Sequence, residues 1–225
     1  MILTKTNLQK LQSNQLKDLA EFIVTENFKH HSNNALPEDY RNDVNSIYKE
    51  EINFYRNSKI YVSRDDSNQI SGAIRLLRWN LMDVLPIEKI FGIDPIAAIP
   101  GSTVKGIYHI GRFAIKKEVK DIQLFKQLMV CAIAPICEHE DNVAFAEIDS
   151  KLLRILNLLG IETTVIGDSI MYLGSETIPV LMTSKGLTIF YNKNKHLVGD
   201  FLEKPVKPYI LPESVVFGRS TFTTL

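Results

Sequence analysis

The chain has 225 residues, 45% of them hydrophobic and 23% charged, and its 26 basic residues balance its 26 acidic ones. This composition is typical of a soluble globular protein with one main core. The balanced charge leaves no overall field that would draw the protein to nucleic acid or to an anionic membrane, so neither partner is expected. No apolar run is long enough to span a membrane or to act as a secretory signal, and we expect a cytoplasmic protein.

Two helices are expected in the first quarter of the chain. Apolar residues at helical spacing predict one helix over residues 16–28 and a second over residues 35–58, near whose start Pro37 stands. His30 and His31 lie between them. Because adjacent side chains point to different faces and no carboxylate pattern accompanies them, we interpret the pair as a solvated linker and expect no metal.

The pattern then changes to that of β-strands. Residues 59–65 and 70–79 are two β-rich runs around a short polar segment, which predicts a hairpin. Residues 80–106 are irregular and rich in proline and glycine, yet they carry apolar side chains of their own. A loop of that length indicates a function beyond connection.

The second half of the chain alternates strand and helix patterns. In chain order the expected strands are residues 108–115, 142–150, 163–168 and 178–183, and the expected helices are residues 121–134 and 151–159. This order is typical of a mixed α/β layer, and the glycine-rich motifs of dinucleotide-binding and P-loop folds are absent. We expect one domain over residues 1–184, followed by an extension over residues 185–225 that packs on the domain or on a partner in a homodimer.

Two short runs, GAIRLLRW at 72–79 and YHIGRFAI at 108–115, carry a family resemblance. With the element order from about residue 16 to residue 183, they resemble the acyl-homoserine-lactone (autoinducer) synthases and the long-chain N-acyl amino acid synthases, which are GNAT-type acyltransferases. Those families have an Arg-Leu-Leu run before the long loop and an aromatic-Glu-apolar-Ser-Arg-Phe run on the fourth strand. The matching residues are Arg75, Leu76, Leu77, Tyr108, Arg112, Phe113, Ala114 and Ile115. The resemblance implies a GNAT-like mixed central sheet flanked by helices.

Four positions depart from these patterns. His109 stands where the autoinducer synthases have a glutamate, and Gly111 stands where they have a small hydroxyl residue. The turn KKEVKD at 116–121 lacks the glycines that cradle the pyrophosphate in ordinary GNAT acetyltransferases, and Leu156 occupies the place of a tyrosine that can act as their acid. These departures weaken an acetyl-CoA assignment more than an assignment to enzymes that use acyl carrier protein or longer acyl-CoA donors.

The strand at 108–115 and the turn after it are expected to bind the donor thioester. Gly111 permits a bulge that would splay this strand from its neighbour, so that a pantetheine arm pairs with the freed backbone groups as an added strand does. The helix start beyond Ile115 and the lysines beside it offer positive charge to a phosphate; the alternative is a solvated lysine cluster. These lysines are Lys116, Lys117 and Lys120.

N-acyl transfer needs a base for the attacking amine and donors for the developing oxyanion. His109 is the first candidate for the base, because neutral imidazole is available near pH 7, and Glu147 is the second. Arg75 and Arg112 either position a carboxylate of the acceptor or belong to a structural ion-pair network. Strict alternation along the strand places Ile107, His109, Gly111 and Phe113 on one face and Tyr108, Ile110, Arg112 and Ala114 on the other.

The resemblance implies an N-acyltransferase that moves an acyl group from an acyl carrier protein or acyl-CoA thioester to the amine of a small, amino-acid-like acceptor. We expect loop 80–106, with Phe91 and Ile93, and the first two helices to shape the acyl pocket, and Tyr108 and Phe113 to contact substrate. Two alternatives stay open: a catalytically silent acyl-thioester-binding module, and a plain acetyl-CoA-dependent N-acetyltransferase. Release of free thiol would distinguish the N-acyltransferase from the silent binding module. A preference for longer acyl chains would distinguish it from the plain N-acetyltransferase.

Overall fold

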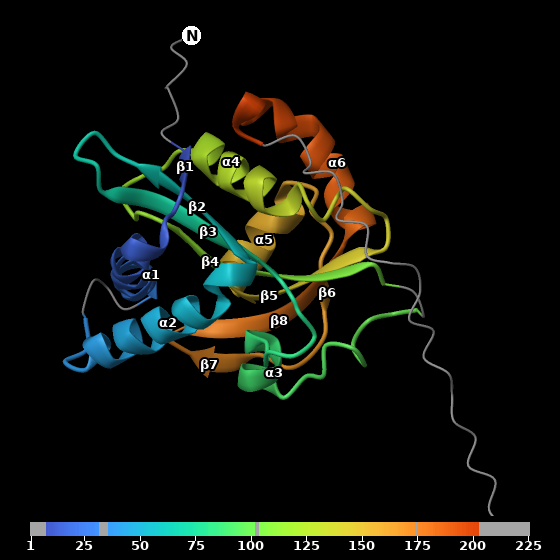
Figure 1. The fold of residues 1–225 in the computed structure, drawn as a ribbon, viewed down its shortest axis with the longest axis horizontal. Coiled ribbons are helices and arrows are strands. Elements are labelled where there is room, and N and C mark those ends of the chain that lie inside the picture. The colour runs from blue at the N-terminus through green and yellow to red at the C-terminus, as the bar shows by residue number, and fades with distance from the viewer. Residues whose placement is uncertain (1–7, 32–35, 102–103, 174, 203–225) are drawn as a thin grey trace, which may run out of the picture.

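The protein is an eight-stranded sheet with helices on both faces (Figure 1). The computed structural model describes residues 8–31, 36–101, 104–173 and 175–202. Within them the strands are β1 (Leu8–Lys10), β2 (Ser58–Arg64), β3 (Ile70–Arg78), β4 (Gly106–Ile115), β5 (Asn142–Asp149), β6 (Thr164–Val165), β7 (Ile170–Tyr172) and β8 (Ser175–Thr183). Their order in the sheet is β1-β2-β3-β4-β5-β8-β6, with β7 paired to β8. Only β4 and β5 are parallel neighbours among these described strands.

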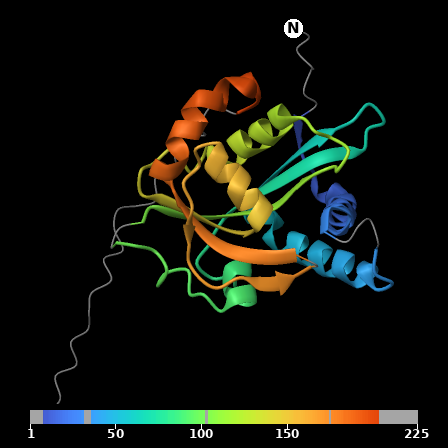
Figure 2. The same cartoon turned by 180° about the vertical axis from the view of Figure 1, so that it is seen from behind.

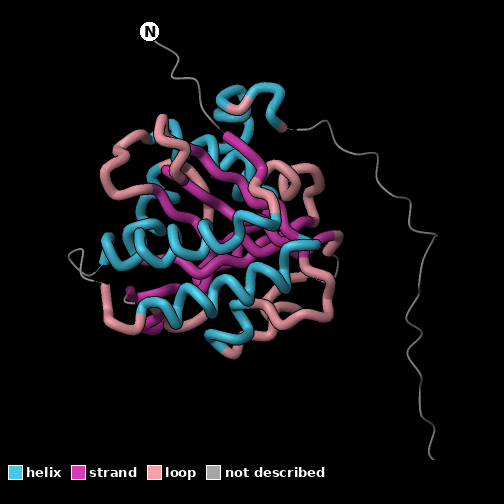
Figure 3. The backbone as a smooth tube through the Cα atoms, turned by 60° about the vertical axis from the view of Figure 1, so that its left-hand side comes forward, coloured by secondary structure: helices cyan, strands magenta, loops and turns pink. Residues whose placement is uncertain are grey.

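Six α-helices cover the sheet in the described part of the chain: α1 (Leu16–His31), α2 (Tyr40–Phe54), α3 (Pro86–Phe91), α4 (Ile122–Ile133), α5 (Ser150–Leu158) and α6 (Ser184–Asn194). Figure 3 shows α1 and α2 lying side by side over one face of the sheet. The opposite face carries α4, α5 and α6, as Figure 2 shows from behind. The mixed central sheet flanked by helices that the sequence predicts is therefore confirmed.

The core consists of apolar layers on both faces of the sheet. Alternation along the strands sends Ile110, Ala144 and Ala146 toward α4 and α5, into the largest cluster. The neighbouring residues Ile107 and Phe145 point the other way, into a cluster closed by α2 and α3. Because both faces of the central strands are buried, they read as nearly continuous apolar runs, and each polar residue within them stands out.

Four elements differ from the sequence-based expectation, and the first is the short strand β1 at Leu8–Lys10, where no strand is expected. The stretch taken as an irregular loop contains α3, and a three-residue strand, β7, lies before β8. Beyond Ser184, where the pattern weakens, the chain forms α6, which packs on α4 and adds Leu187 and Phe190 to the core. Residues 203–225 lie outside the described residues. No described helix is long and apolar enough to cross a membrane.

A gap and a bulge on β4 prepare the site. The parallel pairing of β4 with β5 extends from Gly106 only to His109, which faces Phe145, so the two strands separate beyond that point. On its other edge β4 is bulged, because Arg112 and Phe113 together face Ile74 of β3. The splay expected beside Gly111 is thus present, but the residue with a positive φ, 54°, is Arg112.

The bulge corrects the strict alternation expected along this strand. One extra residue moves every later side chain to the other face. Phe113 packs edge-on against Phe125 of α4, on the side of Ile110 and away from His109. Arg112 instead joins the polar network around His109.

Candidate active site

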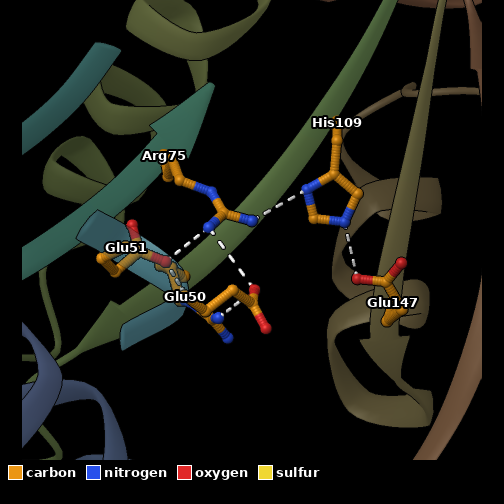
Figure 4. A network of polar contacts seen from close by, with 6 residues as sticks. Glu50, Glu51, Arg75, His109 and Glu147 are labelled. Carbon is orange, nitrogen blue, oxygen red and sulfur yellow. Dashed lines mark hydrogen bonds and ion pairs between the residues drawn. The ribbon is translucent and has the colours of Figure 1, made fainter. Parts of the chain in front are cut away.

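A buried polar network links three strands to α2 (Figure 4). Arg75 of β3 is fully buried and lies over the ring of Phe54, with its Cζ atom 5.2 Å from the ring centroid. Its Nη1 donates to Oε1 of Glu51, which is also fully buried, and its Nη2 lies 3.2 Å from Nδ1 of His109. A buried arginine needs such partners, and Glu51 supplies the charge.

Arg112 closes the network from β4. Its Nε donates to Oε1 of Glu51 at 2.7 Å, and its Nη2 donates to Oε1 of Glu50. Glu50 Oε1 also lies 3.6 Å from Nη1 of Arg75. The adjacent glutamates of α2 therefore engage both guanidinium groups.

The charges of this network fix its protonation. Burial would raise the pKa of the Glu51 carboxyl, but the guanidinium groups of Arg75 and Arg112 outweigh burial and lower that pKa. For Arg112, burial would lower the pKa, and the carboxylates of Glu51 and Glu50 outweigh it and raise the pKa. Glu51 is accordingly an ionised carboxylate at neutral pH.

The hydrogen bonds of His109 define its tautomer. Guanidinium groups only donate, so Nδ1 of His109 accepts from Arg75. Nε2 lies 2.8 Å from Oε2 of Glu147 on β5 and carries the proton that it donates to this carboxylate. Both ring nitrogens are therefore engaged while the imidazole is neutral, and no lone pair remains to accept a proton from a substrate.

Glu147 keeps one oxygen without a partner. Its Oε1 atom is buried and accepts no hydrogen bond within the described residues, although the side chain is 10% exposed. Glu147 lines a cavity between the helices on the two faces of the sheet. An ionised oxygen held in this way is a strong hydrogen-bond acceptor and can take a proton from a bound group.

This cavity has a volume of about 560 Å³ and passes through the gap between β4 and β5. On the α1 and α2 face its wall is polar and includes Glu50, His109, Arg112, Glu147 and Tyr172; we call this the polar half. On the α4 and α5 face the wall is apolar and includes Ile110, Phe113, Phe125, Met129, Ile148, Leu152, Leu156 and Met182; we call this the apolar half. The cavity can hold a chain-like ligand whose polar part lies at Glu147 and whose apolar part lies under α4.

The mouth of the cavity lies where β4 and β5 end. Lys116 pairs with Asp65, its Nζ 3.1 Å from Oδ2, and the backbone N–H of Lys117 donates to Glu26. Lys120 lines the mouth and has no salt bridge within the described residues. At the start of α4, Asp121 uses its own carboxylate to cap the helix by accepting from the N–H of Gln123.

Comparisons with known proteins identify the fold. No protein-family model and no curated protein sequence matches this chain. The structure of BjaI, a CoA-dependent acyl-homoserine lactone synthase with SAM and isopentyl-CoA, is similar with a TM-score of 0.57 at 13% identity, over 84% of this chain and 90% of that one. FeeM, an N-acyl amino acid synthase from uncultured soil microbes, gives a TM-score of 0.57 at 15% identity, over 85% of this chain and 98% of its own. A GNAT-family acetyltransferase from Staphylococcus aureus gives 0.51 at 14% identity, over 80% and 99%.

The chain has a GNAT-like fold. The resemblance predicted from two short runs of sequence is confirmed at this level. Identities this low establish the fold and leave the reaction to be argued from the site.

Within the GNAT-like fold, most of the residues expected at the site come together. His109, Arg112, Phe113, Ile115, Lys116, Lys120 and Glu147 line the cavity, and Arg75 lies behind His109. Tyr108 is buried in the core under α4, outside the cavity wall, and Lys117 also lies outside that wall.

The expected acyl-pocket residues are placed elsewhere. Phe91 and Ile93 pack on the cluster around Leu77, away from the cavity wall. Pro86 and Ile90 are the residues that α3 contributes to the wall, and the apolar side chains of the apolar half come from α4, α5 and the strands β4, β5 and β8.

Five residues near the cavity were not expected at the site from the sequence. Glu50 and Glu51 carry the network, and the signal for Glu51 is its place on the apolar stripe of α2 with Val44 and Ile47. Tyr172 of β7 lines the polar half, and burial raises the pKa of its phenol, so the hydroxyl is protonated at neutral pH. His30 and His31, interpreted as a linker, form the last turn of α1 and line the mouth. The described residues contain no cluster of side chains suited to hold a metal ion.

Proposed function

We propose that the protein is an N-acyltransferase that moves an acyl group from a pantetheine thioester, carried by acyl carrier protein or coenzyme A, to the amine of a small acceptor. The observation that carries the proposal is the unpaired Oε1 of Glu147, in a cavity that passes through the gap between β4 and β5. The GNAT-like fold, shared with acyl-transferring synthases, supports it.

The donor fits the two halves of the cavity. Beyond His109 the edge of β4 that faces β5 has no β5 partner, which leaves backbone groups for the amides of a pantetheine arm. The apolar half extends past Leu156 to Met129 and Met182, which favours an acyl chain longer than acetyl. Lys120 at the mouth is placed to contact the phosphate of the donor, with Ile115 and Lys116 beside the arm.

The chemistry begins at Glu147. Oε1 takes a proton from the acceptor's ammonium group, and the resulting amine attacks the thioester carbonyl carbon, forming the C–N bond. Backbone N–H groups on the free edge of β4 face the developing oxyanion. The C–S bond then breaks, the sulfur takes a proton, and the nitrogen gives its second proton to the group that protonated the sulfur. The products are an amide and a free thiol, and Glu147 returns its proton to solvent. We assign the proton donation to the sulfur to Tyr172, which is protonated and lines the same wall, and which recovers a proton from the nitrogen.

His109 has a positioning role in this scheme. Because its Nε2–H donates to Oε2 of Glu147, the imidazole orients the carboxylate and leaves Oε1 without a hydrogen-bond partner among the described residues. Arg75 in turn holds the His109 tautomer by donating to Nδ1. The sequence-based order of candidates is thus reversed in our proposal, with Glu147 as the base.

A thiol-release assay with acyl-CoA thioesters of increasing length and a panel of amines tests the function. We expect thiol release that requires the amine, with an amide product detected by mass spectrometry. If the thioesters bind but no amine-dependent product forms, the protein is a silent acyl-thioester-binding module and not an enzyme. A preference for acetyl-CoA over every longer chain would favour the plain acetyltransferase.

A further inference from the structure

The polar half of the cavity carries more negative than positive charge. The carboxylates of Glu50 and Glu51 pair with the guanidinium groups of Arg75 and Arg112, whereas the carboxylate of Glu147 is bound by His109. His109 adds no charge while it accepts from Arg75 and donates to Glu147. One negative charge therefore remains, and it lies on Glu147.

Neither guanidinium group is available to a carboxylate of the acceptor without competition. Arg75 is fully buried, lies outside the cavity wall and is bound by Glu51. Arg112 reaches the wall, but it is shared between Glu51 and Glu50. An incoming carboxylate at Arg112 would lie beside two carboxylates already in place, and such like-charge contacts are strongly unfavourable.

The unpaired oxygen of Glu147 would be stabilised by a bound cation or hydrogen-bond donor. Oε2 of Glu147 is bound by His109, whereas Oε1 is buried without a partner among the described residues. Two other network atoms, Oε2 of Glu51 and Nε of Arg75, also have no partner, but neither residue belongs to the cavity wall, whereas Glu147 does. Glu147 is thus a wall carboxylate whose buried, unpaired oxygen can recognise a ligand.

We propose that the acceptor is a primary amine that carries no carboxylate group, such as an alkylamine or a diamine, bound as its ammonium ion to Oε1 of Glu147. The proposal rests on the proposed function and narrows its acceptor from the amino-acid type expected from the sequence. Two cations at the mouth, Lys116 and Lys120, do not weaken it, because Lys116 is paired with Asp65 and Lys120 is the group assigned to the donor phosphate.

Matched pairs of acceptors that differ only in the carboxylate test this inference. Suitable pairs are phenethylamine and phenylalanine, 3-methylbutylamine and leucine, and putrescine and ornithine. With a saturating long-chain acyl-CoA, we expect kcat/KM for each amine to exceed that for its amino acid at least about tenfold. Equal values, or a preference for the amino acids, would overturn the proposal.

Two variants separate this charge effect from pocket size. Glu50→Gln removes a competing carboxylate from Arg112, so the ratio of amine to amino-acid kcat/KM should fall toward one. Glu176→Gln is a matched control in the same cavity wall, because Glu176 contacts Ser169 and not Arg112, and its ratio should equal that of the parent. A Glu50→Gln ratio as high as that of the parent contradicts the argument.

Failure of the proposed function would be distinguishable. If no compound releases thiol, isothermal titration calorimetry of putrescine and ornithine with the parent protein still decides the acceptor class. Binding of putrescine and not of ornithine supports the inference without catalysis. Preferred binding of ornithine, or binding of neither, overturns it.

Discussion

Gly111 and His109 lie so close that a Cβ atom on Gly111 would be 2.8 Å from Cε1 of His109. The same Cβ would lie 3.2 Å from Nη2 of Arg75. Autoinducer synthases, which the sequence resembles, have a glutamate and a small hydroxyl residue at these two positions. The histidine here requires the glycine, because any larger residue would enter the space of the imidazole and of the arginine that orients it. The two departures from the pattern are therefore one coupled change.

Gly111→Ala should disturb the site more than the fold. Overpacking of a well-packed region costs about 1–3 kcal/mol, and here it displaces His109 from Glu147. We expect reduced turnover with a modest loss in the free energy of unfolding, measured by thiol release and by urea denaturation. In a His109→Ala background, where the ring is absent, the added methyl group should cost less, because only the 3.2 Å contact with Nη2 of Arg75 remains. Equal costs in both backgrounds would show that the contact with His109 is not the cause.

The buried ion pairs predict a pH-dependent stability. Glu51→Gln leaves Arg75 without its main carboxylate, and breaking a buried pair costs about 3–5 kcal/mol. The pKa of Glu51 is lowered in the folded state from its ordinary value of 4.5, so its contribution is fully present above pH 4.5 and is lost as the pH falls toward the folded-state pKa. Urea denaturation should show a large difference between parent and variant at neutral pH that shrinks below pH 4.5. A difference that stays constant through that range would contradict the assignment.

The sequence predicts the long helices and central strands of this fold better than its short elements. The apolar spacing in the sequence predicts several elements that the structure contains: the β2–β3 hairpin, β4, α4, β5 and α5. The short helix α3 was missed although Pro86 at its first turn and Gly92 after its end, with φ of 67°, are the usual signals of a helix start and stop. Strand β7 has three residues, too few for any period to appear.

Some residues of the candidate site could be identified from the sequence, and others required the structure. His109, Arg112 and Glu147 were identified because polar residues interrupt buried strands. Their roles required the structure, because the bulge at Arg112 changes which face that residue reaches. Glu50 and Glu51 come from a helix more than fifty positions before Arg112, and no local pattern joins them to it.

The apolar half of the cavity predicts the determinants of acyl-chain length. Met129→Ala should lengthen this half under α4 and shift the preferred acyl chain upward, measured as kcat/KM across a series of acyl-CoA thioesters. The substitution costs about 2–5 kcal/mol of stability, so folding is checked first. Phe91→Ala is the matched control, because Phe91 lies outside the cavity wall and the profile should not move. If the preferred chain length shifts with Phe91→Ala and not with Met129→Ala, loop 80–106 lines the acyl pocket, as the sequence predicts.

Lys120, at the mouth of the cavity, is expected to make a small contribution to the affinity for the donor. Lys120→Glu should weaken the affinity for an acyl-CoA by a factor of about two to five, since exposed charge pairs contribute roughly 0.2–1 kcal/mol. Lys185→Glu on α6, outside the cavity wall, should leave the affinity unchanged. Calorimetry at low and high salt measures both. The proposed placement of the phosphate is wrong if the two variants bind equally well.

The measurement that tests the central claim most directly is amine-dependent thiol release by Glu147→Gln beside His109→Gln. If Glu147 is the base, Glu147→Gln loses on the order of 10²-fold or more in kcat and keeps the donor affinity of the parent. His109→Gln loses less, because the glutamine amide can still donate to the Glu147 carboxylate. Parental turnover by Glu147→Gln, with His109→Gln inactive, would contradict the account and return the base to His109.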